Sequence, residues 1–187
     1  YNCKNINHIN LKHMKKIILV LAMLISGAMA NAQVDVITKH NGEVVKGKVV
    51  KLEEFTIVFK YDGEDAENTI SKYAVQKIVY GKSGRVEEVT DKIVVSTEDD
   101  WEKVVVLEDK AYISGLKKVD EVRGKTGLIN YHTGNTGDKK AEMKLKKAAA
   151  AIGCPFVLMT SDKTTSGYNS NQLGGSQAIK TGIGYKY

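Results

Sequence analysis

Residues suited to nucleophilic chemistry are few in this 187-residue chain, which has two cysteines and four histidines. Cys154 stands between Gly153 and Pro155, just past the end of a predicted helix. The negative end of a helix dipole disfavours a thiolate and therefore raises the pKa of a nearby thiol. We expect Cys154 to be buried at the corner between helix and strand and to be unreactive.

One catalytic set can be drawn from the remaining residues. Ser161 and Asp162 directly follow a predicted buried strand, and His132 lies in a loop rich in Gly and Asn. A serine, a histidine and an aspartate brought together would make a hydrolase, but Ser161 lacks the G-x-S-x-G context of a nucleophile elbow. We therefore assign no catalytic residue and keep a small secreted hydrolase, with a site near Ser161, Asp162 and His132, as the alternative function.

The sequence contains no pattern typical of a metal or cofactor site. After residue 32 the only His and Cys residues are His40, His132 and Cys154, which form no pair at the spacing of zinc ligands, and the acidic stretch 62–67 lacks the rest of an EF-hand motif. The glycine pair Gly174-Gly175 precedes no predicted helix, so it does not form a phosphate-binding turn. We predict neither a metal nor a cofactor.

Tyrosines offer a different kind of site. Tyr131 and Tyr168 lie in polar loops, and an exposed tyrosine is typical of a binding surface because its ring combines apolar area with a hydroxyl group. Tyr185 and Tyr187 are expected to cover a sheet instead. We predict a binding surface at Tyr131 and Tyr168.

The first 32 residues have the pattern of a targeting segment. Met14 is followed by Lys15-Lys16, an apolar run over residues 17–25, and Ala30-Asn31-Ala32 before Gln33. This predicts a signal peptide over residues 14–32, with residues 1–13 as upstream read-through. Its apolar run is shorter than the roughly 18 residues of a membrane span, and no later stretch reaches that length. We expect a periplasmic or secreted protein with no transmembrane span in the mature chain.

Cleavage at that point changes the charge and the cysteine count. The removed segment contains four lysines and no acid, so 28 Lys and Arg become 24 against 22 Asp and Glu, and the net charge falls from +6 to +2. A nearly balanced, exported chain gives no reason to expect nucleic acid as a partner. Cys3 is also removed, which leaves Cys154 without a disulfide partner.

The element that must position these residues is a helix followed by a strand. An apolar stripe with helical spacing is formed by Ala141, Leu145, Ala148 and Ile152. Gly153 and Pro155 then provide the signals that end a helix. The apolar run Phe156–Met159 predicts a strand buried beneath that helix.

The rest of the chain indicates an α+β protein in two parts. Residues 33–95 contain short β-branched runs and an Asn41-Gly42 hairpin turn, which predict a small all-β domain, either a β-barrel or a bent meander. Residues 99–187 predict a small α/β domain with one main helix packed on a sheet. Its strands are expected at 101–107, 116–125, 156–159 and 177–187, with a polar loop over 161–176.

Both parts resemble known families. The phrase VVKGKVVKL after the Asn-Gly turn resembles Sm-like and other SH3-like small barrels, which implies a topology for the first part. The order LKKVDEVRGKTG, helix, VLMTSD and GIGYKY over residues 116–187 resembles bacterial RcsF and YbjQ-type α/β domains. RcsF-like proteins act in the cell envelope through protein partners, although this chain lacks their lipid-anchor and disulfide-forming cysteines.

Together these patterns favour a non-catalytic, exported protein of the bacterial cell envelope. We expect it to be a binding or interaction module whose partner is a protein or another envelope component.

Overall fold

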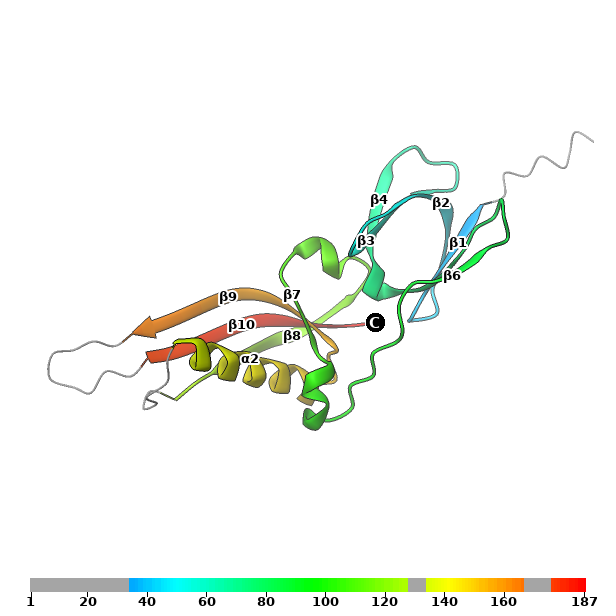
Figure 1. Ribbon diagram of the computed structural model, residues 1–187. Helices are drawn as coiled ribbons and strands as arrows, with labels where there is room; N and C mark the ends of the chain where they lie inside the picture. Colours follow the sequence, from blue (N-terminus) through cyan, green and yellow to red (C-terminus); the bar gives the residue numbers. More distant parts are fainter. Residues whose placement is uncertain (1–33, 128–133, 167–175) are drawn as a thin grey trace, which may run out of the picture. The chain divides into compact units, whose positions relative to one another are not determined.

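The computed structural model describes residues 34–127, 134–166 and 176–187. The predicted read-through segment and signal peptide lie outside these residues. The described chain forms two sheets and one main helix, which agrees with the predicted α+β class (Figure 1). None of the helices in the described part of the chain combines the length and apolarity needed to cross a membrane.

The first sheet is antiparallel and has the strand order β4-β3-β2-β1-β5-β6. Its strands are β1 (Asp35–Lys39), β2 (Val44–Leu52), β3 (Thr56–Tyr61), β4 (Glu67–Ser71), β5 (Val75–Val79) and β6 (Val86–Glu88), with the one-turn helix η1 (Lys72–Ala74) between β4 and β5. The Asn41-Gly42 turn joins β1 and β2 as predicted, and Gly42 has a φ of +88°, a conformation that glycine adopts without strain.

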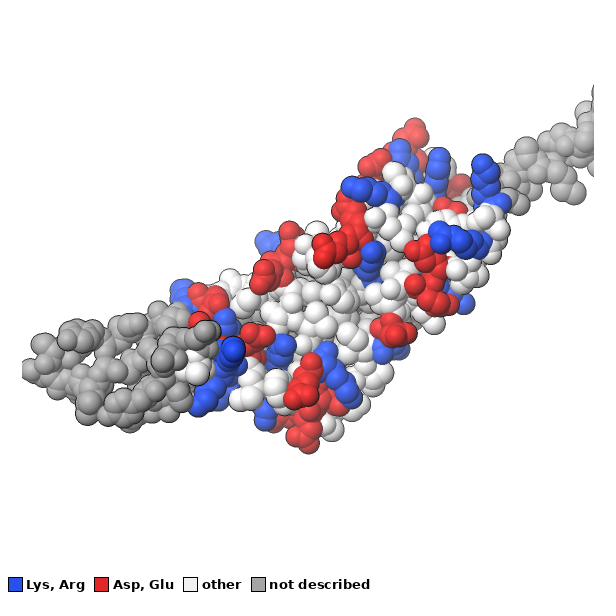
Figure 2. Space-filling view, in the orientation of Figure 1, with Lys and Arg blue, Asp and Glu red and all other residues white. Residues whose placement is uncertain are grey.

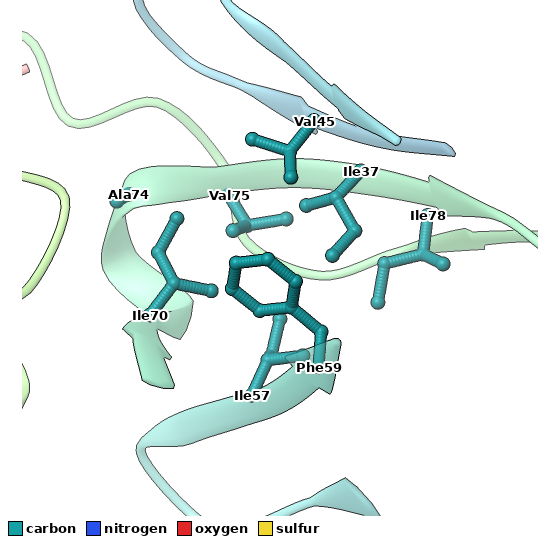
Figure 3. Packing of buried hydrophobic residues seen from close by; sticks show 8 residues of the cluster. All are labelled: Ile37, Val45, Ile57, Phe59, Ile70, Ala74, Val75 and Ile78. Carbon is teal, nitrogen blue, oxygen red and sulfur yellow. The ribbon is translucent and has the colours of Figure 1, made fainter. Parts of the chain in front are cut away.

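Alternating residues of these strands fill the core of the first sheet. Figure 3 shows the Phe59 ring surrounded by aliphatic side chains from the neighbouring strands, and Ile37, Ile57 and Ile78 are fully buried. Strands β4 and β6 are the two edges of the sheet and do not pair with each other. The described residues therefore form no closed barrel, which was one of the two predictions for this part.

The second sheet has the order β7-β9-β10-β8. Its elements are β7 (Val105–Leu107), β8 (Lys117–Lys125), α2 (Gly134–Ala151), β9 (Phe156–Ser166) and β10 (Ser176–Lys186). The short helix η2 (Glu98–Lys103) precedes β7, and the short helix η3 (Lys110–Ile113) follows it. Strand β7 is parallel to β9, whereas β10 is antiparallel to both β9 and β8. Helix α2 lies along one face of this sheet (Figure 1).

Two details of the sequence prediction for this part were wrong. Strand β9 continues to Ser166, so residues 161–166 are strand and not loop. Residues 98–103 form η2, which leaves only Val105–Leu107 as strand in the predicted 101–107 segment. In both places the pattern of β-branched and polar residues did not locate the element boundary, which depends on pairing with β10 and β9.

Helix α2 ends as its sequence predicts. Gly153 has a φ of +66°, its N–H donates to the Ala150 carbonyl at 2.9 Å, and the Cys154 N–H donates to the Ala149 carbonyl at 3.0 Å. These two bonds form a Schellman motif. Ala141, Leu145 and Ala149 are fully buried, whereas Ile152, predicted to belong to the stripe, is 42% exposed because it lies beyond the last helical residue.

Glycines of β8 and β10 allow α2 to lie close to the sheet. A Cβ atom at Gly124 would lie 2.0 Å from the Ala141 carbonyl oxygen and 2.5 Å from the Leu145 nitrogen. A Cβ atom would lie 2.5 Å from a Val157 methyl group at Gly182 and 3.0 Å from the Cys154 sulfur at Gly184. At these glycine positions the sheet has no space for a side chain.

Substitution of Gly124 by alanine tests this contact. Because the clash is with helix backbone, we expect Gly124→Ala to lower the free energy of unfolding in urea by about 2 kcal/mol or more. Gly137→Ala is the matched control: it lies within α2, its Cβ would be 3.7 Å from the Ala178 Cβ, and it should raise stability by about 0.5–1 kcal/mol. Equal stability of the two variants would contradict the close packing.

Candidate functional site

The end of the second sheet at which β9 finishes and β10 starts is the candidate site. In the register, Ser166 is opposite Ser176, and Ile179 is opposite both Lys163 and Lys125. Helix α2 also starts at this end (Figure 1). The chain therefore leaves β8 and β9, and enters α2 and β10, at the same end of the sheet.

Lys180 is a buried cation at this end. Its side chain is only 8% exposed and forms an ion pair with Asp162, directly opposite on β9, whose side chain is 46% exposed. Ala178, Lys180 and Gly182 share the face of β10 that α2 covers. A lysine in that position requires a partner, because burial of an unpaired charge is costly.

A second buried polar group ties β10 to the end of β8. The Gln177 amide donates to the Thr126 carbonyl at 2.8 Å, and the Ala178 N–H donates to the Thr126 hydroxyl at 2.9 Å. Thr126 and Gln177 are both buried. These bonds continue the pairing of β10 with the β8 segment beyond the last residue of β8 and satisfy the buried polar groups there.

Ser161 and Asp162 are not brought together. Consecutive strand residues point to opposite faces, and Asp162 lies on the α2 face with Lys180, whereas Ser161 is opposite Thr181 on the other face. The Asp162 carboxylate is bound to Lys180. His132, the third member of the set drawn from the sequence, lies outside the described residues, as do Tyr131 and Tyr168 of the predicted binding surface.

His40 lies in the turn after β1 and is half-buried. Its ring makes an edge contact with Tyr187, with centroids 4.8 Å apart, and its Nε2 lies 3.0 Å from the Thr90 hydroxyl. The hydroxyl of Thr90 lies 2.9 Å from the Val75 carbonyl, to which it donates its single proton, so His40 Nε2 is the donor to Thr90. Burial and the nearby charge of Lys92 lower the pKa of His40.

Tyr187 connects the end of the chain to the segment between the two sheets. Its hydroxyl accepts a bond from the Ile93 N–H at 2.9 Å, and its ring packs edge-on against Phe156. Tyr185 is buried in the same cluster. Both tyrosines cover the sheet, as predicted, and His40 takes part in that packing.

Cys154 is buried, as predicted. It is fully inaccessible, its sulfur lies 3.9 Å from the Ile152 carbonyl, and burial raises its pKa. A thiol in this state is a poor nucleophile.

The described residues hold no group of three or more His, Cys, Asp or Glu side chains placed to bind a metal ion. A shallow groove of about 430 Å³ lies on the outer face of α2, lined by Glu98, Met143, Lys144, Lys147, Ala148 and Ala151. Its charged groups are engaged, because Lys147 pairs with Glu98 at 3.4 Å and the Lys144 ammonium donates to the Lys125 carbonyl. Figure 2 shows further Lys and Arg side chains over the start of α2.

Comparison with known proteins gives no assignment: no protein-family model, curated protein or solved structure matches the chain.

Sequence reasoning missed Lys180 and its partner. The signal was present, since Lys180 alternates with Ala178, Gly182 and Gly184 on the small-residue face of the last strand. A lysine on a face that must accept a helix predicts a paired, buried charge. Its partner could not be named, because residues 161–166 were interpreted as a loop.

Removal of either partner tests the buried pair. Asp162→Asn leaves the Lys180 ammonium buried without its counter-ion, and we expect a loss of about 1–2 kcal/mol in the free energy of unfolding, limited by the partial exposure of Asp162. Lys180→Met removes the buried charge and should cost less. The two variants are compared by urea denaturation at pH 7. A larger loss for Lys180→Met would show that the pair is not what stabilises this end.

Stability should depend on the titration of His40. Its pKa is lowered in the folded state from the ordinary value of 6.5, so the unfolded chain binds the proton more readily. Stability is therefore highest above pH 6.5 and falls below it, by at most about 1.4 kcal/mol per pH unit. His40→Gln should reduce the slope of unfolding free energy between pH 7 and pH 5. An unchanged slope would exclude His40 as its source.

Proposed function

We propose that this chain is an exported, non-catalytic protein of the bacterial cell envelope that binds a protein or another envelope component through one end of its second sheet. The observation that carries the proposal is the position of the strand ends. The segment that contains Tyr131 joins β8 to α2, and the segment that contains Tyr168 joins β9 to β10. Both are anchored at the same end of the sheet.

The anchors of these segments are held firmly. The Lys180–Asp162 pair joins β10 to β9, and the bonds of Gln177 and Ala178 to Thr126 join β10 to the end of β8. Loops on a rigid base are the usual location of recognition residues, because the base limits the entropy lost on binding. This arrangement supports a binding role for Tyr131 and Tyr168.

The two family resemblances are part of this proposal. In the first sheet β1 to β4 form a meander and β5 returns beside β1, which we interpret as an incompletely closed relative of the SH3-like small barrels. In the second part a single helix covers a four-stranded sheet, in keeping with an RcsF or YbjQ-type α/β domain. Cleavage after Ala32 and residence in the periplasm or medium belong to the same proposal.

A capture experiment tests the binding surface. The affinity-tagged full-length chain is expressed in a bacterial host, cross-linked and recovered from an envelope extract. We expect Tyr131→Ala/Tyr168→Ala to reduce capture of the partner by at least about tenfold, because aromatic residues at the centre of an interface commonly contribute more than about 1.4 kcal/mol.

Tyr61→Ala is the matched control, since Tyr61 is a 42% exposed tyrosine on the first sheet, far along the chain from both loops. Its capture level should equal that of the unchanged chain. If the double variant captures its partner as well as this control does, the two tyrosines are not the binding surface. Fractionation of the same culture tests export. A chain that remains in the cytoplasm with residues 14–32 intact would contradict the proposed export.

A further inference from the structure

The face of the second sheet opposite α2 is covered over only half of its length. Near one end, Phe156, Leu158 and Tyr185 are buried in a cluster with residues of η1 and η3. Near the other end, where β9 finishes, Ser161, Ile179 and Thr181 on the same face are only half-buried. This half of the face is accessible to a partner.

Two cross-strand rows define the accessible half. In the first row Ile179 of β10 lies between Lys163 of β9 and Lys125 of β8. In the second row Thr181 lies between Ser161 and Arg123. Residues directly opposite in a sheet share a face, so three cations surround a centre of hydroxyl groups and one isoleucine. We call Arg123, Lys125 and Lys163 the sheet cations.

Strand geometry fixes the spacing of the sheet cations. Lys163 and Lys125 lie two inter-strand steps apart, about 10 Å, and Arg123 is two residues from Lys125, about 7 Å. The hydroxyl of Thr160, at the bulge in β9, lies 3.3 Å from that of Thr181 and adds to the polar centre. Charges separated by about 7–10 Å on a flat surface match the repeat of a linear polymer that carries one anionic group per one or two units.

The sheet cations have no counter-ion of their own. All three are exposed, and none forms an ion pair within the described ranges 34–127, 134–166 and 176–187. The nearest acid along β9, Asp162, is on the opposite face with Lys180. Glu121 is the next acid on the same face, one row beyond Arg123 and opposite Ile183. The two rows therefore carry only positive charge.

We propose that the sheet cations form a binding surface for a polyanionic glycan, a linear sugar polymer with carboxylate, sulfate or phosphate groups. This inference rests on the binding function proposed above and names its partner. Hydroxyl groups between the cations suit hydrogen bonds to sugars. A bilayer surface is less suited, because it requires inserted apolar side chains or a larger basic cluster, and nucleic acid would require aromatic rings on which bases stack.

Titration of the purified full-length chain with defined polymers tests the proposal. Dextran sulfate and polygalacturonate are the anionic probes, neutral dextran is the polymer control, and vesicles of phosphatidylglycerol and phosphatidylcholine in equal parts are the lipid probe. We expect binding to both anionic polymers and none to dextran. Affinity should fall with salt along a log–log slope of about −2, as expected when three cations release counter-ions.

Two matched triple variants distinguish binding at the sheet cations from binding that depends only on the net charge of the protein. Arg123→Gln/Lys125→Gln/Lys163→Gln should weaken polymer binding by about tenfold or more. Lys46→Gln/Lys48→Gln/Lys82→Gln removes the same three charges from exposed, unpaired positions of the first part and should bind like the unchanged chain. Thermal melts check that both triple variants are folded. If the first variant melts at a lower temperature than the unchanged chain, its three single variants replace it, each with an expected loss of polymer affinity of about twofold.

Three results would overturn the inference. Equal losses in the two triple variants would reduce binding to an effect of net charge. Vesicle binding that depends on the sheet cations would assign the surface to anionic lipid. Absence of polymer binding while capture from the envelope extract still depends on Tyr131 and Tyr168 would remove the glycan and leave the proposed binding function intact.

Discussion

The contact of α2 with the glycine face of the second sheet is the constraint on which the other features depend. Gly124 allows the helix backbone to lie within van der Waals distance of β8, so no side chain larger than a hydrogen atom fits there. This contact buries Ala141 and Leu145, shields Cys154 at the helix end and encloses Lys180. It also leaves the opposite face of the same strands to carry Arg123 and Lys125.

Much of this part could be predicted from the sequence because several local signals agree. The stripe of Ala141 and Leu145, the left-handed Gly153 and the apolar run from Phe156 specify a helix, its end and a buried strand. The last strand was predicted from alternation alone. The predictions for the helix, its end and the buried strand were reliable because each signal follows from local backbone geometry and does not depend on distant residues.

The candidate site was less predictable, for a physical reason. Residues 161–166 are polar on both faces, so periodicity cannot identify them as a strand, and only pairing with β10 makes them one. Lys163 was therefore not recognised as a site residue, and Asp162 was grouped with Ser161 and His132 instead of with Lys180. The contacts of His40 with Thr90 and Tyr187 were not predicted either, because both residues are 50 or more positions away in the sequence.

The strand order of the second sheet has a consequence for the time at which this part can fold. Strand β10 is the last element in the chain, yet it lies between β9 and β8 and is the sole link between them in the sheet. Strand β8 therefore has no partner in the sheet until β10 is present, and β7 must wait for β9, about 50 residues later, to pair. The second sheet consequently depends on contacts between residues far apart in the sequence, which form slowly.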